Sequence, residues 1–105
     1  MDKNIRMIRG DTLSFGLEFE GLEQDLESAY FTVKSSYSDT KPVFQKSLDN
    51  GITKSDTGKY RVRVAPEDTK YVEADKYFYD LQIGVNSDIF TILKGTIDIE
   101  DDVTV

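Results

Sequence analysis

The side chains that most often carry enzyme chemistry are missing from this chain. Its 105 residues include no histidine and no cysteine, which excludes the usual general base, thiol nucleophiles, and nitrogen or thiolate ligands for metals. The 20 aspartates and glutamates remain. Two carboxyl groups that face each other across a cleft can hydrolyse glycosides. However, so many acidic residues form some pairs by chance, and so short a domain rarely encloses a deep pocket. We therefore predict that the protein is not an enzyme and has no catalytic or cofactor-binding residues.

The best candidate for a metal site is the acidic run near the end of the sequence. Asp98, Glu100, Asp101 and Asp102 could offer oxygens to a hard cation such as calcium, which takes about six to eight of them. Their spacing does not match the EF-hand loop. Charges at the end of a strand also protect an exposed sheet edge. We favour this second interpretation and predict no metal site.

Aromatic side chains are the candidates for binding. Tyr71, Tyr77, Phe78 and Tyr79 lie close together in the sequence, and aromatic rings can stack on sugars or anchor a protein partner. Tyr77 and Tyr79 are in phase with the apolar residues that follow them, which predicts core positions, whereas Phe78 points to the opposite face. Tyr30 is likewise out of phase with its apolar neighbours. We predict an interaction surface that includes Tyr30, Tyr71 and Phe78.

The spacing of apolar residues predicts strands along the whole chain. In segment 12–20 apolar and other residues alternate, which places the apolar ones on one face of a strand. The predicted strands are 4–8, 12–20, 29–34, 43–48, a short piece near 52, 59–65, 76–85 and 89–99. Gly95, inside the last strand, predicts a bulge or a close approach of another backbone segment. Pro66 ends the predicted strand 59–65 and favours one helical turn within 66–72.

Turn-forming residues separate these strands at intervals of about 8–12 residues, which is typical of a β-sandwich or small barrel. We predict one domain over residues 1–105 with an all-β fold, an antiparallel two-sheet sandwich of seven to eight strands. Two sheets are needed because their alternating apolar faces can then cover each other. Loops 35–42, 66–75 and 86–88 are expected to carry specificity.

The composition limits the class of partner. The net charge is −7 and the 13 basic residues are scattered, so we predict binding to neither nucleic acid nor an anionic membrane surface. No stretch reaches the roughly 18 apolar residues of a membrane helix. The first residues lack the apolar core of a signal peptide, so we expect synthesis in a cytoplasm without one.

Several segments resemble a known family. They are Arg9-Gly10-Asp11-Thr12, Asp68-Thr69 ahead of Tyr79-Asp80-Leu81-Gln82, and Gly95-Thr96-Ile97-Asp98-Ile99 with Asp102-Val103-Thr104. Over nearly its full length the chain resembles small immunoglobulin-like structural proteins of tailed phages and of prophages in Gram-positive bacteria, and it is similar to the N-terminal domain of baseplate upper proteins. The resemblance implies an immunoglobulin-like sandwich with a structural or assembly role in the tail or baseplate. Its partners would be other virion proteins or copies of itself, and the virion component would be made in the bacterial cytoplasm.

Segment 74–83 resembles the strand entry of immunoglobulin-like sandwiches, where a tyrosine follows a tight corner. In such a tyrosine corner the hydroxyl bonds to an upstream backbone group, and the resemblance implies this structural role for Tyr77. The alternative function is a glycan- or receptor-binding module, with a host surface glycan as partner. Exposed aromatics beside polar groups in a groove would favour the alternative, whereas a flat, symmetric protein contact would favour assembly.

Overall fold

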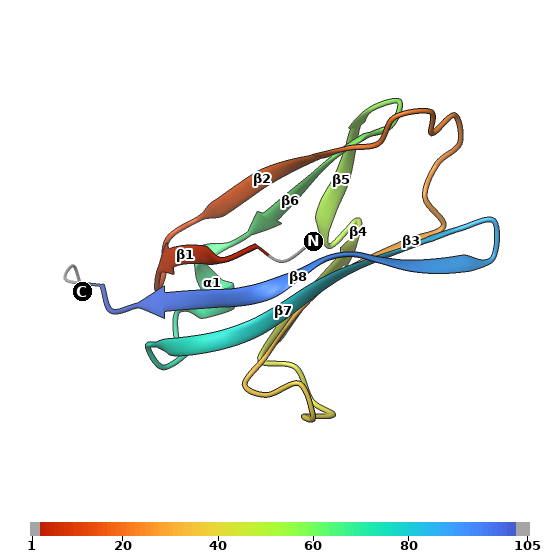
Figure 1. Ribbon diagram of the computed structural model, residues 1–105. Helices are drawn as coiled ribbons and strands as arrows, with labels where there is room; N and C mark the ends of the chain where they lie inside the picture. Colours follow the sequence, from red (N-terminus) through yellow and green to blue (C-terminus); the bar gives the residue numbers. More distant parts are fainter. Residues whose placement is uncertain (1–2, 103–105) are drawn as a thin grey trace.

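The computed structural model describes residues 3–102. Eight strands and one short helix make up this part of the chain (Figure 1). They are β1 (Ile5–Ile8), β2 (Leu13–Glu18), β3 (Ser28–Lys34), β4 (Phe44–Leu48), β5 (Gly51–Asp56), β6 (Lys59–Val64), α1 (Pro66–Thr69), β7 (Asp75–Val85) and β8 (Asp88–Glu100). The all-β prediction is confirmed. Val103 and Thr104, which contribute to the family resemblance, lie outside the described residues.

The strands form one continuous hydrogen-bonded sheet in the order β1-β8-β7-β3-β4-β5-β6-β2. The sheet is rolled, so that β2 and β6 lie over β8 and β7 with the core between them (Figure 1). The prediction of two sheets therefore needs a correction. The backbone passes from one layer to the other at β4 and β5, whose parallel pairing consists of Ser47 with Gly51 and Leu48 with Ile52. A turn as tight as Asp49-Asn50 keeps the two strands close enough to bond.

The remaining pairings are antiparallel, except that β1 lies parallel to β8. β5 is longer than the short piece expected near residue 52 because it pairs with β6 as far as Asp56. Gly95 marks a close backbone approach, as its position in the strand suggested. A Cβ atom at Gly95 would collide with the carbonyl oxygen of Lys3.

Aromatic rings from both layers meet at the centre of the core. Phe31 of β3 is fully buried, and its ring centroid lies 5.7 Å from that of Phe15, 6.4 Å from that of Phe44 and 5.5 Å from that of Tyr79. Phe15 belongs to β2, in the opposite layer. Because edge-on and tilted ring pairs are favourable beyond the area that they bury, this cluster holds the layers together. Within residues 3–102, no helix combines the length and apolarity that crossing a bilayer would require.

Candidate functional site

The structure places two of the three aromatic residues predicted for binding on one surface. Tyr30 of β3 and Phe78 of β7 project from the outward side of β4, β3, β7 and β8, here called the outer face, because their strand neighbours Phe31 and Tyr79 are buried in the core. Tyr71 lies elsewhere, in the segment after α1. It is 87% exposed, and the Lys70 ammonium lies 5.4 Å from its ring centroid.

A further aromatic residue on the outer face was missed by sequence reasoning. Tyr37 belongs to the loop between β3 and β4, is 62% exposed, and packs its ring against Phe78 with centroids 4.6 Å apart at a tilt of 39°. Strand periodicity could not find Tyr37 because it lies in a loop. A single aromatic residue within a run of serine, aspartate and threonine was the only available signal.

Hollows in the outer face surround Asp80 of β7. Three adjoining hollows include this residue, and the largest, of about 470 Å³, is lined by Tyr37, Asp80, Thr91, Leu93 and Lys94, a set here called the Asp80 hollow. Asp80 lies between Thr32 of β3 and Lys94 of β8 in the sheet register. Considering residues 3–102, the Asp80 carboxylate has no hydrogen bond or ion pair to another side chain. It is therefore available to a ligand.

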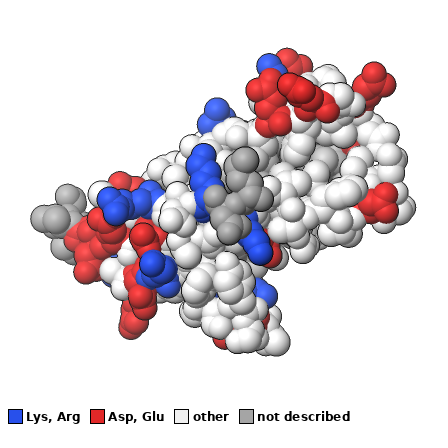
Figure 2. Space-filling model, viewed as in Figure 1, with Lys and Arg blue, Asp and Glu red and all other residues white. Residues whose placement is uncertain are grey.

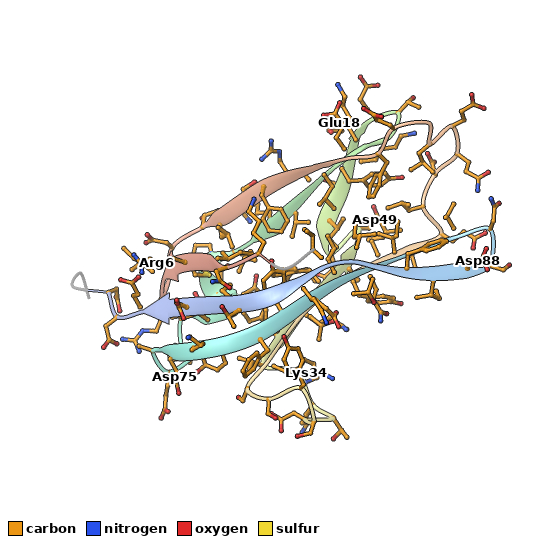
Figure 3. The ribbon with its side chains drawn as sticks, in the orientation of Figure 1. Arg6, Glu18, Lys34, Asp49, Asp75 and Asp88 are labelled. Carbon is orange, nitrogen blue, oxygen red and sulfur yellow. The ribbon has the colours of Figure 1, made fainter. Side chains whose placement is uncertain are left out.

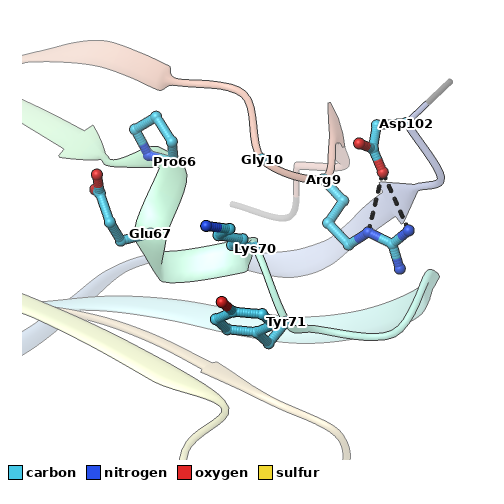
Figure 4. A pocket seen from close by; sticks show the side chains of 7 residues that line it. All are labelled: Arg9, Gly10, Pro66, Glu67, Lys70, Tyr71 and Asp102. Atoms are coloured by element: carbon cyan, nitrogen blue, oxygen red, sulfur yellow. Dashed lines mark hydrogen bonds and ion pairs between the residues drawn. The ribbon is translucent and has the colours of Figure 1, made fainter. Parts of the chain in front are cut away.

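A second pocket, of about 560 Å³, opens beside α1 (Figure 4). Its lining residues are Arg9, Gly10, Pro66, Glu67, Lys70, Tyr71 and Asp102. The Arg9 guanidinium donates to Asp102 Oδ1 over 3.2 and 3.1 Å and to the Val72 carbonyl over 3.4 Å, and the Gly10 amide donates to the Thr69 hydroxyl over 2.8 Å. The Arg9 guanidinium is thus already engaged, and these bonds link the segments around residues 9–10 and 102 to α1 and the residues after it.

The acidic run at the end of the sequence meets two arginines. Arg6 pairs with Glu100 at 2.8 Å, and Arg9 pairs with Asp101 at 3.2 Å and with Asp102 at 3.1 Å. Figure 2 shows that acidic side chains gather at both ends of the elongated molecule. These arginines offset part of the negative charge at the end where β8 finishes.

The first half of β8 has an open edge. β1 covers β8 only at residues 97–100, and the Lys3 amide donates to the Lys94 carbonyl over 3.0 Å. As far as residues 3–102 show, β8 pairs with β7 alone over residues 88–92. Ile89 and Phe90 in this stretch are 64% and 48% exposed, and Asp88 marks its tip at the far end of the hairpin (Figure 3). Unpaired backbone groups beside exposed apolar side chains can accept another strand.

Tyr77, the residue to which the resemblance assigns a tyrosine corner, is buried at the start of β7. Its hydroxyl donates to the Glu73 carbonyl, four residues upstream, over 2.6 Å. Burial, together with the nearby charges of Asp75 and Glu73, raises the pKa of Tyr77 above its ordinary value. The neutral hydroxyl is the form that this corner needs, because only that form can donate to a carbonyl.

No known protein family matches the sequence, and no curated protein matches it. Among solved structures, the chain is similar to the extracellular domain of the voltage-gated sodium channel β4 subunit, with a TM-score of 0.49 and 14% sequence identity over 97% of this chain and 93% of that chain. That domain forms parallel homodimers that explain its role in cell–cell adhesion. A similarity at this level assigns no function to the present chain.

Proposed function

We propose that this chain is a non-catalytic assembly module, an immunoglobulin-like sandwich that joins other protein chains through the open edge of β8. Strand order supports the immunoglobulin-like part. β7 lies between β8 and β3, as strand F lies between G and C, and β6 lies between β2 and β5, as strand E lies between B and D. Tyr77 also lies at the start of β7 and bonds back to the corner before it, where immunoglobulin-like domains have a tyrosine.

The open edge at residues 88–92 is the observation that carries the proposal. A strand added there would hydrogen-bond to the free backbone groups of β8 and would cover Ile89 and Phe90. In strand addition of this kind, main-chain bonds supply affinity and the alternating side chains supply specificity. The bulge at Ile92, between the residues that pair with Leu81 and Gln82, limits the available edge to a short stretch. The partner is therefore expected to contribute a short strand.

The sequence resemblance supports a phage or prophage virion, in its tail or baseplate region, as the place of this assembly. The partners would be other virion proteins or further copies of this chain, made together in the bacterial cytoplasm. Mass spectrometry of purified particles, induced from a lysogen that carries the gene, tests this context. Particles that lack the polypeptide would contradict the virion role while leaving the edge itself to be tested separately.

Charged substitutions at the open edge test the mode of assembly. Ile89→Lys and Phe90→Lys add charges that oppose strand addition, and each is expected to abolish concentration-dependent association in light scattering or incorporation into particles. Tyr71→Lys is the matched control, since Tyr71 is more exposed than either residue and lines the pocket beside α1 rather than the edge at residues 88–92. Assembly that survives both β8 substitutions unchanged would refute the proposed edge.

A further inference from the structure

We propose that the Asp80 hollow is a binding site for a neutral pyranose ring of a glycan. This site lies on the outer face. Thr91 also belongs to the open edge of β8 at residues 88–92, but the site uses its side chain, whereas strand addition uses the backbone groups of that edge. It is built from a loop and two strands, because Tyr37 precedes β4, Asp80 belongs to β7, and Thr91 and Lys94 belong to β8. The proposal goes beyond assembly and stands independently of it.

Tyr37 supplies a fixed aromatic platform. Its ring is held against Phe78, and its loop is braced by a 3.0 Å contact between the Ser36 and Ser38 hydroxyls and by a 3.1 Å bond from the Asp39 amide to the Ser36 carbonyl. One face of a pyranose ring consists largely of C–H groups, which pack well on an aromatic ring. A platform that is already ordered loses little conformational entropy when the sugar binds.

Polar groups of complementary kinds lie beside this platform. Asp80 and Lys94 are direct cross-strand partners, so their Cβ atoms lie roughly 5 Å apart on the same face. The carboxylate only accepts hydrogen bonds, the ammonium only donates them, and the Thr91 hydroxyl does both. Within the described residues, the side chains of Asp80 and Lys94 form no hydrogen bond or ion pair. Neighbouring hydroxyls on a sugar ring can donate to Asp80 and accept from Lys94 at once.

Size and charge narrow the class of ligand. A hollow of about 470 Å³ lies within the range of roughly 300–1,000 Å³ that small-ligand sites occupy. The free Asp80 carboxylate and the net charge of −7 oppose an acidic sugar. A wholly apolar ligand would bury Asp80 and Lys94 without partners, which is costly. In the pocket beside α1, unlike in the Asp80 hollow, the charged Arg9 side chain already bonds to Asp102 and is not free for a ligand.

Titration of the isotope-labelled chain, followed through its amide NMR signals, tests this site. The probes are the methyl glycosides of glucose, galactose, mannose and N-acetylglucosamine, with methyl glucuronide as the acidic counterpart. We expect at least one neutral glycoside to give saturable shifts at Tyr37, Asp80, Thr91 and Lys94, with millimolar affinity, and the glucuronide to bind at least about tenfold more weakly. If no neutral glycoside gives saturable shifts there up to about 50 mM, the proposal is wrong.

Two substitutions and one control show which side chains hold the sugar. Tyr37→Ala removes the platform and Asp80→Ala removes the acceptor, and each is expected to weaken binding about tenfold or more. Tyr71→Ala removes an equally large exposed ring outside the outer face and should leave binding unchanged. Affinities of both site variants equal to that of the original chain would overturn the assignment. If Tyr37→Ala alters the spectrum of the free protein, its loss of binding could reflect a changed structure, and the affinity of Asp80→Ala alone then tests the assignment.

Discussion

The region around α1 and the tip of the β7–β8 hairpin differ in how many tertiary contacts hold them in place. At α1, polar side chains tie together segments that are far apart in the sequence. The Lys46 ammonium contacts the Asp68 carboxylate at 3.0 Å, and the Gly10 amide donates to the fully buried Thr69 hydroxyl. At the hairpin tip, in contrast, residues 88–92 pair on one side only within the described part of the chain, and Ile89 and Phe90 are exposed.

The difference follows from the length of the elements. A helix of four residues, as in α1, cannot be stable alone, so its position depends on tertiary partners. Asp68 stabilises α1 in two ways. Its carboxylate pairs with Lys46 from β4, and it also accepts a 2.7 Å bond from the Ala65 amide at the start of the helix. The β7–β8 hairpin has eleven ladder pairs and can leave its tip unsupported. Substitutions should therefore be costly near α1 and tolerated at the hairpin tip.

The largest effect is expected at the ion pair beneath α1. Lys46→Met would leave the mostly buried Asp68 carboxylate without its cation, which should lower the free energy of unfolding by about 3 kcal/mol. Urea denaturation measures the change. Lys54→Met is the matched control, because Lys54 forms an exposed pair with Asp25, and exposed pairs contribute little. A Lys46 variant as stable as the control would show that the α1 region does not depend on this pair.

A somewhat smaller loss is expected at the glycine that makes room for Lys46. Gly51 has φ of +102°, and a Cβ atom there would collide with the Lys46 side chain. Gly51→Ala combines backbone strain with this clash and should destabilise the protein by about 2 kcal/mol. In Gly21→Ala, also at positive φ but with open space around it, only the backbone cost of about 1 kcal/mol remains. Equal losses in thermal denaturation would contradict the proposed clash.

The tyrosine corner should give an intermediate effect with a distinctive pH dependence. Tyr77→Phe deletes the bond to Glu73 and should cost about 1 kcal/mol near neutral pH. Because the pKa of Tyr77 is raised in the folded state, its contribution is complete below the ordinary tyrosine pKa of about 10 and is lost as the pH rises above it.

Stability curves between neutral and strongly alkaline pH check this sign. The Phe variant should lose less stability than the original chain as the pH rises past 10. Tyr71→Phe, at an exposed ring, should follow the original chain throughout. If the loss of stability at alkaline pH is the same in Tyr77→Phe as in the original chain, it must arise from another titrating group.

The smallest effect is expected at the hairpin tip. Ile89→Ser removes a side chain that is 64% exposed, so the unfolding free energy should change by no more than about 0.5 kcal/mol. Association should nevertheless weaken if residues 88–92 form the docking edge. A loss of stability comparable to that of Lys46→Met would show that the tip is part of the structural core and would remove the contrast between the two regions.

Alternation of apolar residues along the sequence was enough to predict an all-β chain and most of its strands, because strand periodicity is a local property of neighbouring side chains. Gly95 was likewise informative, since only a missing side chain permits so close an approach of Lys3. The predicted separation into two sheets required a correction, because the pairing of β4 with β5 depends on a backbone geometry that no pattern of side chains records.

Other features were decided only by the tertiary structure. Lys46 is in phase with the buried Phe44, yet its burial depends on Asp68 from a distant segment and on the space beside Gly51. The Asp80 hollow brings together a loop residue, Tyr37, with strand residues more than 40 positions away. Such sites depend on which strands become neighbours and in which register. That choice is made by packing of the whole core, so local sequence patterns could not predict it.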